Sequence, residues 1–133
     1  MVDDELLEGE GYAGVATAVM IAVNRRRRVP LIVNVPNRGA IHGLLDDDVV
    51  EVTCMMDEHG AHPLAQGPIP EPARALLAQV KLYERLTVRA AVEGSYDLAL
   101  EALLAHPLVG SYPLARSILD DYLAAHTAYL SLV

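Results

Sequence analysis

The residue best placed for acid–base chemistry in this 133-residue chain is Tyr12, which follows Gly-Glu-Gly and opens a long apolar run. If a helix begins there, free backbone N–H groups and the positive end of the helix dipole surround the phenol and favour a phenolate. Because an unperturbed phenol has a pKa of about 10, it needs strong help to act as a base at neutral pH. The residues alone therefore favour a packing tyrosine and keep a general base as the alternative.

A polar elbow, Asn37-Arg38-Gly39, separates the apolar stretches LIVNVP (31–36) and AIHGLL (40–45). Loops held by a rigid scaffold often carry binding residues. The elbow can hold a substrate or only turn the chain, and the residue types leave both interpretations open.

Three further groups of side chains are weak candidates for metal binding or nucleophilic chemistry. His59 and His62 lack the third and fourth ligands of a zinc site, which favours a solvent-facing hairpin loop. The consecutive carboxylates at 46–48 cannot form an oxygen cage by themselves, which favours a solvated turn. Cys54 lies in an apolar stretch, where a thiol is a small buried hydrophobe that stays protonated. We therefore assign no metal ligand.

Other polar side chains have structural explanations. His106 and His126 lie at or near expected helix ends, where a ring can donate to free carbonyl groups. The run Asn-Arg-Arg-Arg-Arg at 24–28 is predicted to be a solvated helix end, because cations favour the carbonyl terminus of the dipole. Contact with a phosphate or a partner is the alternative for this run.

These residues must be positioned by a small set of elements. Tyr12 to Val23 is apolar on every side except at Thr17, which predicts a helix that is covered all round. Short strands come next and three helices follow, so we expect an α+β fold in which helices pack on one face of a small antiparallel sheet. The expected elements are a helix over 12–23, strands over 29–35 and 49–56 with room for a short strand around Leu64, and helices over 72–94, 95–106 and from 111 onward.

Helical spacing predicts which faces are buried in the later helices. Over 72–94 an apolar stripe runs beside a basic stripe, which is typical of a half-buried helix. The final helix carries two adjoining apolar rows that reach Leu130. The stripes are Leu76, Val80, Tyr83 and Thr87 (apolar) and Lys81, Arg85 and Arg89 (basic), and the rows are Leu114, Ile118 and Tyr122 beside Leu119, Leu123, His126 and Leu130.

Composition limits the class of protein. An apolar content of 53% without Phe or Trp predicts one globular domain over residues 1–133 with a core of Leu, Val, Ala and Ile. The net charge of −8 argues against binding to nucleic acid or an anionic membrane. One cysteine, an acidic N-terminal stretch and no apolar run long enough to span a bilayer indicate a cytoplasmic protein.

Six segments together resemble the C-terminal portion of the family 4 glycoside hydrolases, and among these the 6-phospho-β-glucosidases. The resemblance covers nearly the entire chain, and it implies the C-terminal fold of the lactate/malate dehydrogenase-like family 4 glycosidases. The segments are GEGYAGVATAVMIAV, LIVNVPNRGAI, DDDVVEVTC, GAHPLAQGPIP, VKLYERLTVRAAVEGSYDLALEALLAHPLV and LDDYLAAHTAYL.

The resemblance implies an unusual NAD-dependent cleavage of phosphorylated glucosides. Such enzymes oxidise the sugar at C3, a tyrosine removes the proton at C2, the leaving group is eliminated, and water and then hydride are added. A divalent metal, typically manganese, is held by a cysteine and a histidine. Tyr12 falls where the family's base stands, and Asn37 and Gly39 match its Asn-x-Gly elbow beside the sugar.

Departures from the family pattern limit what the chain is expected to do. No glycine-rich dinucleotide fingerprint follows an N-terminal strand, and neither Cys54 nor His59 matches the metal ligands, so an N-terminal NAD-binding domain is expected to be absent. Leu45 and Thr53 replace prolines and Glu10 replaces a common glycine, so the local backbone is expected to differ from the family pattern at these positions.

Two functions follow. The first is the substrate-side and oligomerisation domain of a glycosidase, inactive until a separate NAD-binding subunit supplies NAD and Mn²⁺. The second is a stand-alone, non-catalytic oligomerising or ligand-binding module. Either way we expect a homo-oligomer, because the apolar helix over 12–23 needs a cover.

Overall fold

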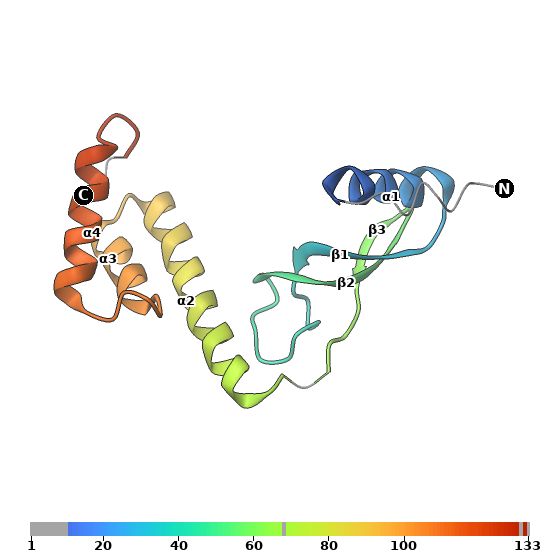
Figure 1. The fold of residues 1–133 in the computed structure, drawn as a ribbon, viewed down its shortest axis with the longest axis horizontal. Helices are drawn as coiled ribbons and strands as arrows, with labels where there is room; N and C mark the ends of the chain where they lie inside the picture. The colour runs from blue at the N-terminus through green and yellow to red at the C-terminus, as the bar shows by residue number, and fades with distance from the viewer. Residues whose placement is uncertain (1–10, 68, 131, 133) are drawn as a thin grey trace. The chain divides into compact units, whose positions relative to one another are not determined.

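The computed structural model describes residues 11–67, 69–130 and 132, and it has the predicted α+β fold (Figure 1). Within these residues, four helices accompany one three-stranded antiparallel sheet. In chain order the elements are α1 (Gly11–Arg25), β1 (Val29–Pro36), β2 (Val49–Asp57), β3 (Gly60–Pro63), α2 (Glu71–Glu93), α3 (Tyr96–Ala105) and α4 (Tyr112–Ala125).

Contacts within the chain divide it into two compact units, with the boundary between Ile69 and Pro70. The first unit contains α1 and the sheet, and the second contains α2, α3 and α4. Each unit has its own cluster of buried apolar side chains. A single folding domain over residues 1–133 stays a prediction, which separate unfolding of the two units would contradict.

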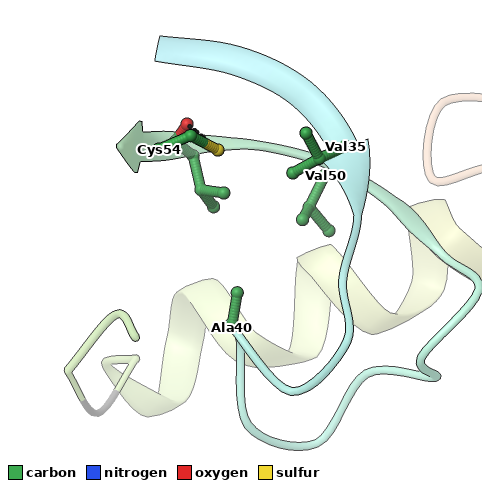
Figure 2. Packing of buried hydrophobic residues seen from close by; sticks show 5 residues of the cluster. Val35, Ala40, Val50 and Cys54 are labelled. Atoms are coloured by element: carbon green, nitrogen blue, oxygen red, sulfur yellow. Dashed lines mark hydrogen bonds between the residues drawn. The ribbon is translucent and has the colours of Figure 1, made fainter. Parts of the chain in front are cut away.

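The sheet of the first unit has the strand order β1-β2-β3. β1 pairs with β2 from Val29 opposite Met56 to Pro36 opposite Val49. Every second residue of β2 is buried, as a sheet with one covered face requires. Figure 2 shows side chains from both strands pointing toward Ala40, which lies in the loop over residues 37–48; this cluster consists of Val35, Ala40, Val50, Val52 and Cys54.

The third strand forms a hairpin with β2. It ends at Pro63, one residue before the position expected from the sequence, and the Leu64 N–H still donates to the Thr53 carbonyl at 3.0 Å. The pairing of β1 with β2 is regular through Thr53, opposite Ile32. The replacement of a family proline by Thr53 therefore leaves an ordinary strand.

α1 buries one face rather than its whole circumference. Ala18, Ile21 and Ala22 are buried at helical spacing, and the helix contacts β1 and β2. Met20 remains 61% exposed, and Val15 is also exposed. The prediction that this helix is covered all round is wrong for the described chain, because the sheet contacts only the face that carries Ala18, Ile21 and Ala22.

The predicted burial of α2 is partly wrong. Lys81 is only 8% exposed and Leu86 and Ala90 are buried, whereas Leu76 is 53% exposed. Lys81 can join an apolar face because its methylene stem packs while its ammonium group bonds the Glu84 carboxylate. The helix ends as predicted at Gly94, whose φ of 67° is left-handed.

The last two helices form the core of the second unit. The Ser95 hydroxyl caps α3 by accepting the Leu98 N–H at 3.3 Å, and Leu100 packs with Ala115 and Leu119 from α4. α4 ends at Ala125, so the predicted helical row as far as Leu130 is wrong. The main reason is His126, whose backbone leaves the helical region at φ −122° and ψ 26°.

Across the described parts of the chain, every helix is too short or too polar to cross a lipid bilayer.

Candidate functional site

The elbow after β1 begins a loop that one buried side chain holds together. Asn37 is 0% exposed. Its Oδ1 accepts the Ile41 N–H at 2.7 Å, and its Nδ2 donates to the carbonyls of Ile41 at 3.1 Å and Leu44 at 3.3 Å. Both amide donors and the acceptor are thus used within the loop over residues 37–48.

Backbone hydrogen bonds close the same loop at its base. The Asn37 N–H donates to the Asp48 carbonyl at 2.8 Å, and the Arg38 N–H donates to the Asp46 carbonyl at 3.0 Å. The Ala40 carbonyl accepts the N–H of Gln66 at 2.9 Å, which ties the loop to the segment after β3. The loop therefore has few ways to rearrange.

The tip of the loop has two consecutive residues in the left-handed region. Arg38 has a φ of 44° and Gly39 a φ of 82°. Glycine adopts this region at little cost, whereas for arginine it is uncommon and strained. A Cβ on Gly39 would have no atom within 4 Å, so glycine is needed there for its backbone angle and not for space. The tip is both exposed and open.

The structure thus assigns Asn37 a loop-holding role that the sequence did not indicate. Its bonding partners are main-chain groups, which no pattern of side chains reveals. Direct contact of Asn37 and Gly39 with a substrate stays a prediction.

Tyr12 is the second residue of α1, so its backbone lies in the first turn of a helix as predicted. Its side chain lies outside the part of the chain that the structure describes, as does Glu10. A role for Tyr12 as a general base stays a prediction.

The aspartates of the loop differ from one another. Asp46 and Asp47 are exposed, which confirms a solvated turn for these two. Asp48 is buried, and its Oδ2 accepts the Leu45 N–H at 3.0 Å. The solvated turn was therefore the wrong prediction for Asp48, which helps to close the loop.

The hairpin between β2 and β3 is organised by Asp57, a residue that sequence analysis missed. Its side chain is 7% exposed. Its Oδ1 accepts the His59 N–H at 2.8 Å and lies 2.9 Å from His62 Nε2, and its Oδ2 lies 3.7 Å from Arg28 Nε. The His59 N–H, and next the His62 ring, lower the pKa of the Asp57 carboxyl. An aspartate two residues before a turn amide is the only sequence signal for this arrangement.

The two imidazoles of the hairpin are exposed to different extents. His59 lies in the turn with its side chain 78% exposed, and His62 lies on β3 with its side chain 52% exposed. Within residues 11–67, 69–130 and 132, no group of three or more His, Cys, Asp or Glu side chains is arranged to hold a metal ion.

Cys54 is a buried thiol on β2, as predicted. It is 0% exposed, and burial raises its pKa. A protonated, enclosed thiol is a poor nucleophile and a poor metal ligand. Cys54 thus contributes packing to the sheet.

Both C-terminal histidines cap helices, which confirms a structural role. His106 donates its backbone N–H to the carbonyls of Ala102 and Leu103. However, its ring Nδ1 accepts a hydrogen bond from the Leu108 N–H at 3.2 Å. The ring also packs edge-to-face against the Tyr83 ring, with 4.6 Å between the ring centroids. The predicted ring donation to a free carbonyl is therefore wrong for His106, because the following N–H needs an acceptor there.

A cavity of about 340 Å³ lies among the three helices of the second unit. Alanine and leucine side chains supply most of its wall, so it offers little for polar chemistry. Its lining is Tyr83, Thr87, Ala90, Ala91, Ala99, Ala102, Leu103, Leu119, Tyr122, Leu130 and Leu132.

Comparison with known sequences places this geometry in context. Residues 3–109 match the model of the family 4 glycosyl hydrolase C-terminal domain. The chain is 40% identical over 122 residues to a probable 6-phospho-beta-glucosidase of Bacillus subtilis, covering 92% of this chain and 28% of that protein. It is 41% identical over 101 residues to the 6-phospho-beta-glucosidase BglT of Thermotoga maritima, covering 76% of this chain and 24% of that protein.

Solved structures agree with these matches. A 6-phospho-alpha-glucosidase from gut microorganisms, in complex with NAD and glucose-6-phosphate, matches with a TM-score of 0.86 and 31% identity over 100% of this chain and 30% of that one. The Thermotoga maritima 6-phospho-beta glucosidase with manganese, NAD⁺ and glucose-6-phosphate matches with a TM-score of 0.84 and 35% identity over 94% of this chain and 31% of that one. The chain spans about a quarter of the length of the curated relatives it matches.

Proposed function

Since this chain belongs to the family 4 glycosyl hydrolases, we propose that it forms the substrate-side domain of a 6-phospho-glucosidase. The sequence relatives and the solved structures that match the chain are both named for this activity. Two of the solved structures contain glucose-6-phosphate. A phosphorylated glucoside is the substrate class that fits these names.

The observation that carries the proposal is the locked loop over residues 37–48. Three hydrogen bonds from the Asn37 side chain fix a tip in which Arg38 is strained and Gly39 is open. Strained, over-determined backbone of this kind concentrates at ligand sites. In this proposal the sugar packs over Gly39, and Asn37 acts as a positioning residue.

Proton removal is assigned to Tyr12 in the same proposal. Its backbone lies in the first turn of α1, where free N–H groups and the helix dipole favour negative charge. That setting supports a phenolate that accepts a proton from carbon beside a carbonyl group. The dipole alone contributes about 0.3–1 kcal/mol at an exposed helix end, which is too little to ionise a phenol at neutral pH.

The residues described in this chain do not fit the cofactors of the relatives. They contain no metal-binding group of three, and none of the described strands leads into a glycine-rich dinucleotide-binding turn. We therefore propose that NAD and Mn²⁺ are held by the remainder of the enzyme, on the same polypeptide or on another.

A chimera tests this function. The segment of the Thermotoga maritima relative that precedes its match is joined to this chain, and nitrophenol release from p-nitrophenyl β-glucoside 6-phosphate is measured with NAD and Mn²⁺. We expect turnover by the chimera and none by this chain alone. Tyr12→Phe should lower turnover by about 10²-fold or more, because it removes the general base.

Two controls make the chimera decisive. Retention of NAD and a native circular dichroism spectrum show that it has folded, and the unphosphorylated glucoside shows whether the phosphate is required. A folded, NAD-loaded chimera without turnover, or one that Tyr12→Phe leaves unchanged, would overturn the proposal.

The exposed face of α1 favours a second candidate, a non-catalytic oligomerising module. Val15, Met20 and Val23 are exposed apolar side chains on one helix, and such surfaces promote association. Sedimentation of the chain with and without Met20→Glu tests this candidate. Loss of a dimer on substitution supports it, and a monomer in both cases excludes it.

A further inference from the structure

We propose that the cavity of the second unit binds a small, uncharged aromatic molecule of one or two rings. The cavity measures about 340 Å³ and lies among α2, α3 and α4. Its lining belongs wholly to the second unit, whereas Tyr12 and the loop over residues 37–48 belong to the first. Binding in the cavity therefore stands or falls independently of the proposed glycosidase function.

Alanine side chains on two neighbouring helices leave this space open. Ala90 and Ala91 come from α2, Ala99 and Ala102 come from α3, and the two helices pack against each other. Protein interiors are normally packed so closely that few voids exceed the size of a water molecule. A cavity of about 340 Å³ is far larger than such a void, and its volume lies at the lower end of the range for ligand sites.

The floor of the cavity is apolar and buried. Ala90, Ala102 and Leu119 are 4%, 2% and 6% exposed, and their side chains offer water no hydrogen-bond partner. A buried water molecule needs about 2–4 polar partners, whereas an apolar cavity of about 150 Å³ stays dry and can bind benzene. An apolar ring is thus a better occupant of this floor than water.

Two tyrosine rings in the lining favour a flat ligand. Tyr83 lies on α2 and Tyr122 lies on α4. The Tyr83 ring packs edge-to-face against His106, and the centroid of the Tyr122 ring lies 5.9 Å from that of the His126 ring. Tyrosine rings that are restrained by a neighbouring ring are well placed to stack on a third one. The cavity therefore favours an aromatic ligand over an aliphatic one of similar size.

The rim of the cavity determines the polarity of the ligand. Thr87 and Tyr122 are exposed, and their hydroxyl groups are polar groups at the opening. None of the described residues that line the cavity is Asp, Glu, Lys, Arg or His. A charged ligand would lose hydration there without gaining an ion pair, whereas one hydroxyl group on the ligand can form a hydrogen bond at the rim. A phenol-like molecule fits both the floor and the rim.

Fluorine NMR of the full chain with p-fluorophenol tests this site. We expect its resonance to broaden on binding, with a dissociation constant on the order of 1 mM for so small a molecule. Fluorobenzoate has a similar ring with a negative charge, and it should bind about tenfold more weakly or less. Cresol should displace the bound fluorophenol more effectively than hexanol does, because cresol is aromatic and hexanol is aliphatic.

Filling substitutions show whether the fluorophenol occupies this cavity. Ala99→Leu and Ala91→Leu enlarge the lining from two different helices, and each should weaken binding by about tenfold. Ala105→Leu and Ala124→Leu are the matched controls, because these alanines have the same burial classes as Ala99 and Ala91 but lie outside the lining. Both controls should bind fluorophenol like the native chain.

Circular dichroism shows which variants fold, and the two filling variants allow the test to proceed if one of them does not. Four results would each overturn the proposal: no broadening with the folded native chain, equal binding of fluorobenzoate, displacement by hexanol as effective as by cresol, or folded filling variants that bind like their controls.

Discussion

The loop after β1 and the hairpin turn after β2 lie at opposite ends of one sheet, and in each of them a buried polar side chain binds several groups. Asn37 bonds three main-chain groups through an amide, whereas Asp57 bonds the His59 N–H and the His62 ring through a carboxylate. An amide has no charge to lose, but a carboxylate can be protonated. The Asn37 bonds in the loop should therefore persist across pH, whereas the Asp57 bonds in the hairpin should weaken in acid.

The largest effect is expected from Asn37→Ala. Truncation removes the side-chain partners of three part-buried main-chain groups, and because each unsatisfied group costs about 1 kcal/mol at the lower end of the range for buried groups, the free energy of unfolding should fall by about 3 kcal/mol. Urea denaturation followed by circular dichroism measures this fall. Asn34→Ala, at an exposed position on β1, is the matched control. Equal losses for the two variants would show that Asn37 does not hold the loop.

Gly39→Ala should have a smaller effect on the same loop. The φ of 82° is strained for alanine, which costs about 1 kcal/mol, while the open space at the site adds no clash. Gly67→Ala is the control, because a Cβ at that glycine also meets open space. If both substitutions leave the urea midpoint unchanged, the left-handed tip is not enforced by the loop.

Asp57→Asn addresses the hairpin and should be visible mainly as a change in pH dependence. Because the folded-state pKa of Asp57 is lowered, its contribution to stability is present above the unfolded-state pKa of about 3.9 and is lost as pH falls through the lowered value. The variant should have a lower urea midpoint than the native chain at about pH 6, and the gap should close toward about pH 3. A gap that is constant over this range would contradict the assignment.

The smallest effect is expected from His62→Ala. The His62 side chain is half exposed, and Asp57 keeps the His59 N–H after the substitution. The urea midpoint at neutral pH should shift less than in Asp57→Asn. A larger shift would make the ring, and not the turn amide, the main support of the carboxylate.

The sequence was sufficient to place helices and strands where the order of apolar residues and helix-ending residues marks them. The apolar run over 49–56 and the glycine stop at Gly94 placed β2 and the end of α2 correctly. The wrong predictions arose where the same residue type can be either buried or exposed. Lys81 was assigned to the solvent-facing side of α2 because of its charge, but its methylene stem is buried. The helix α1 was expected to be covered all round, but only the face with Ala18, Ile21 and Ala22 is buried.

The site was less predictable than the fold. Asn37 was identified by family resemblance as a ligand-side residue, whereas its observed partners are main-chain groups of Ile41 and Leu44, which leave no mark in the sequence. Asp57 escaped notice because its role depends on strand register, which brings Arg28 and His62 to the same carboxylate.

The boundary at Ile69 has a practical consequence for spectroscopy. The chain has no tryptophan, and five of its six tyrosines follow this boundary, so its ultraviolet fluorescence reports mainly on the second unit. A tryptophan introduced at the exposed Ile32 would give the first unit an emission of its own. The thermal unfolding of the first unit and of the second unit could then be followed separately in one sample.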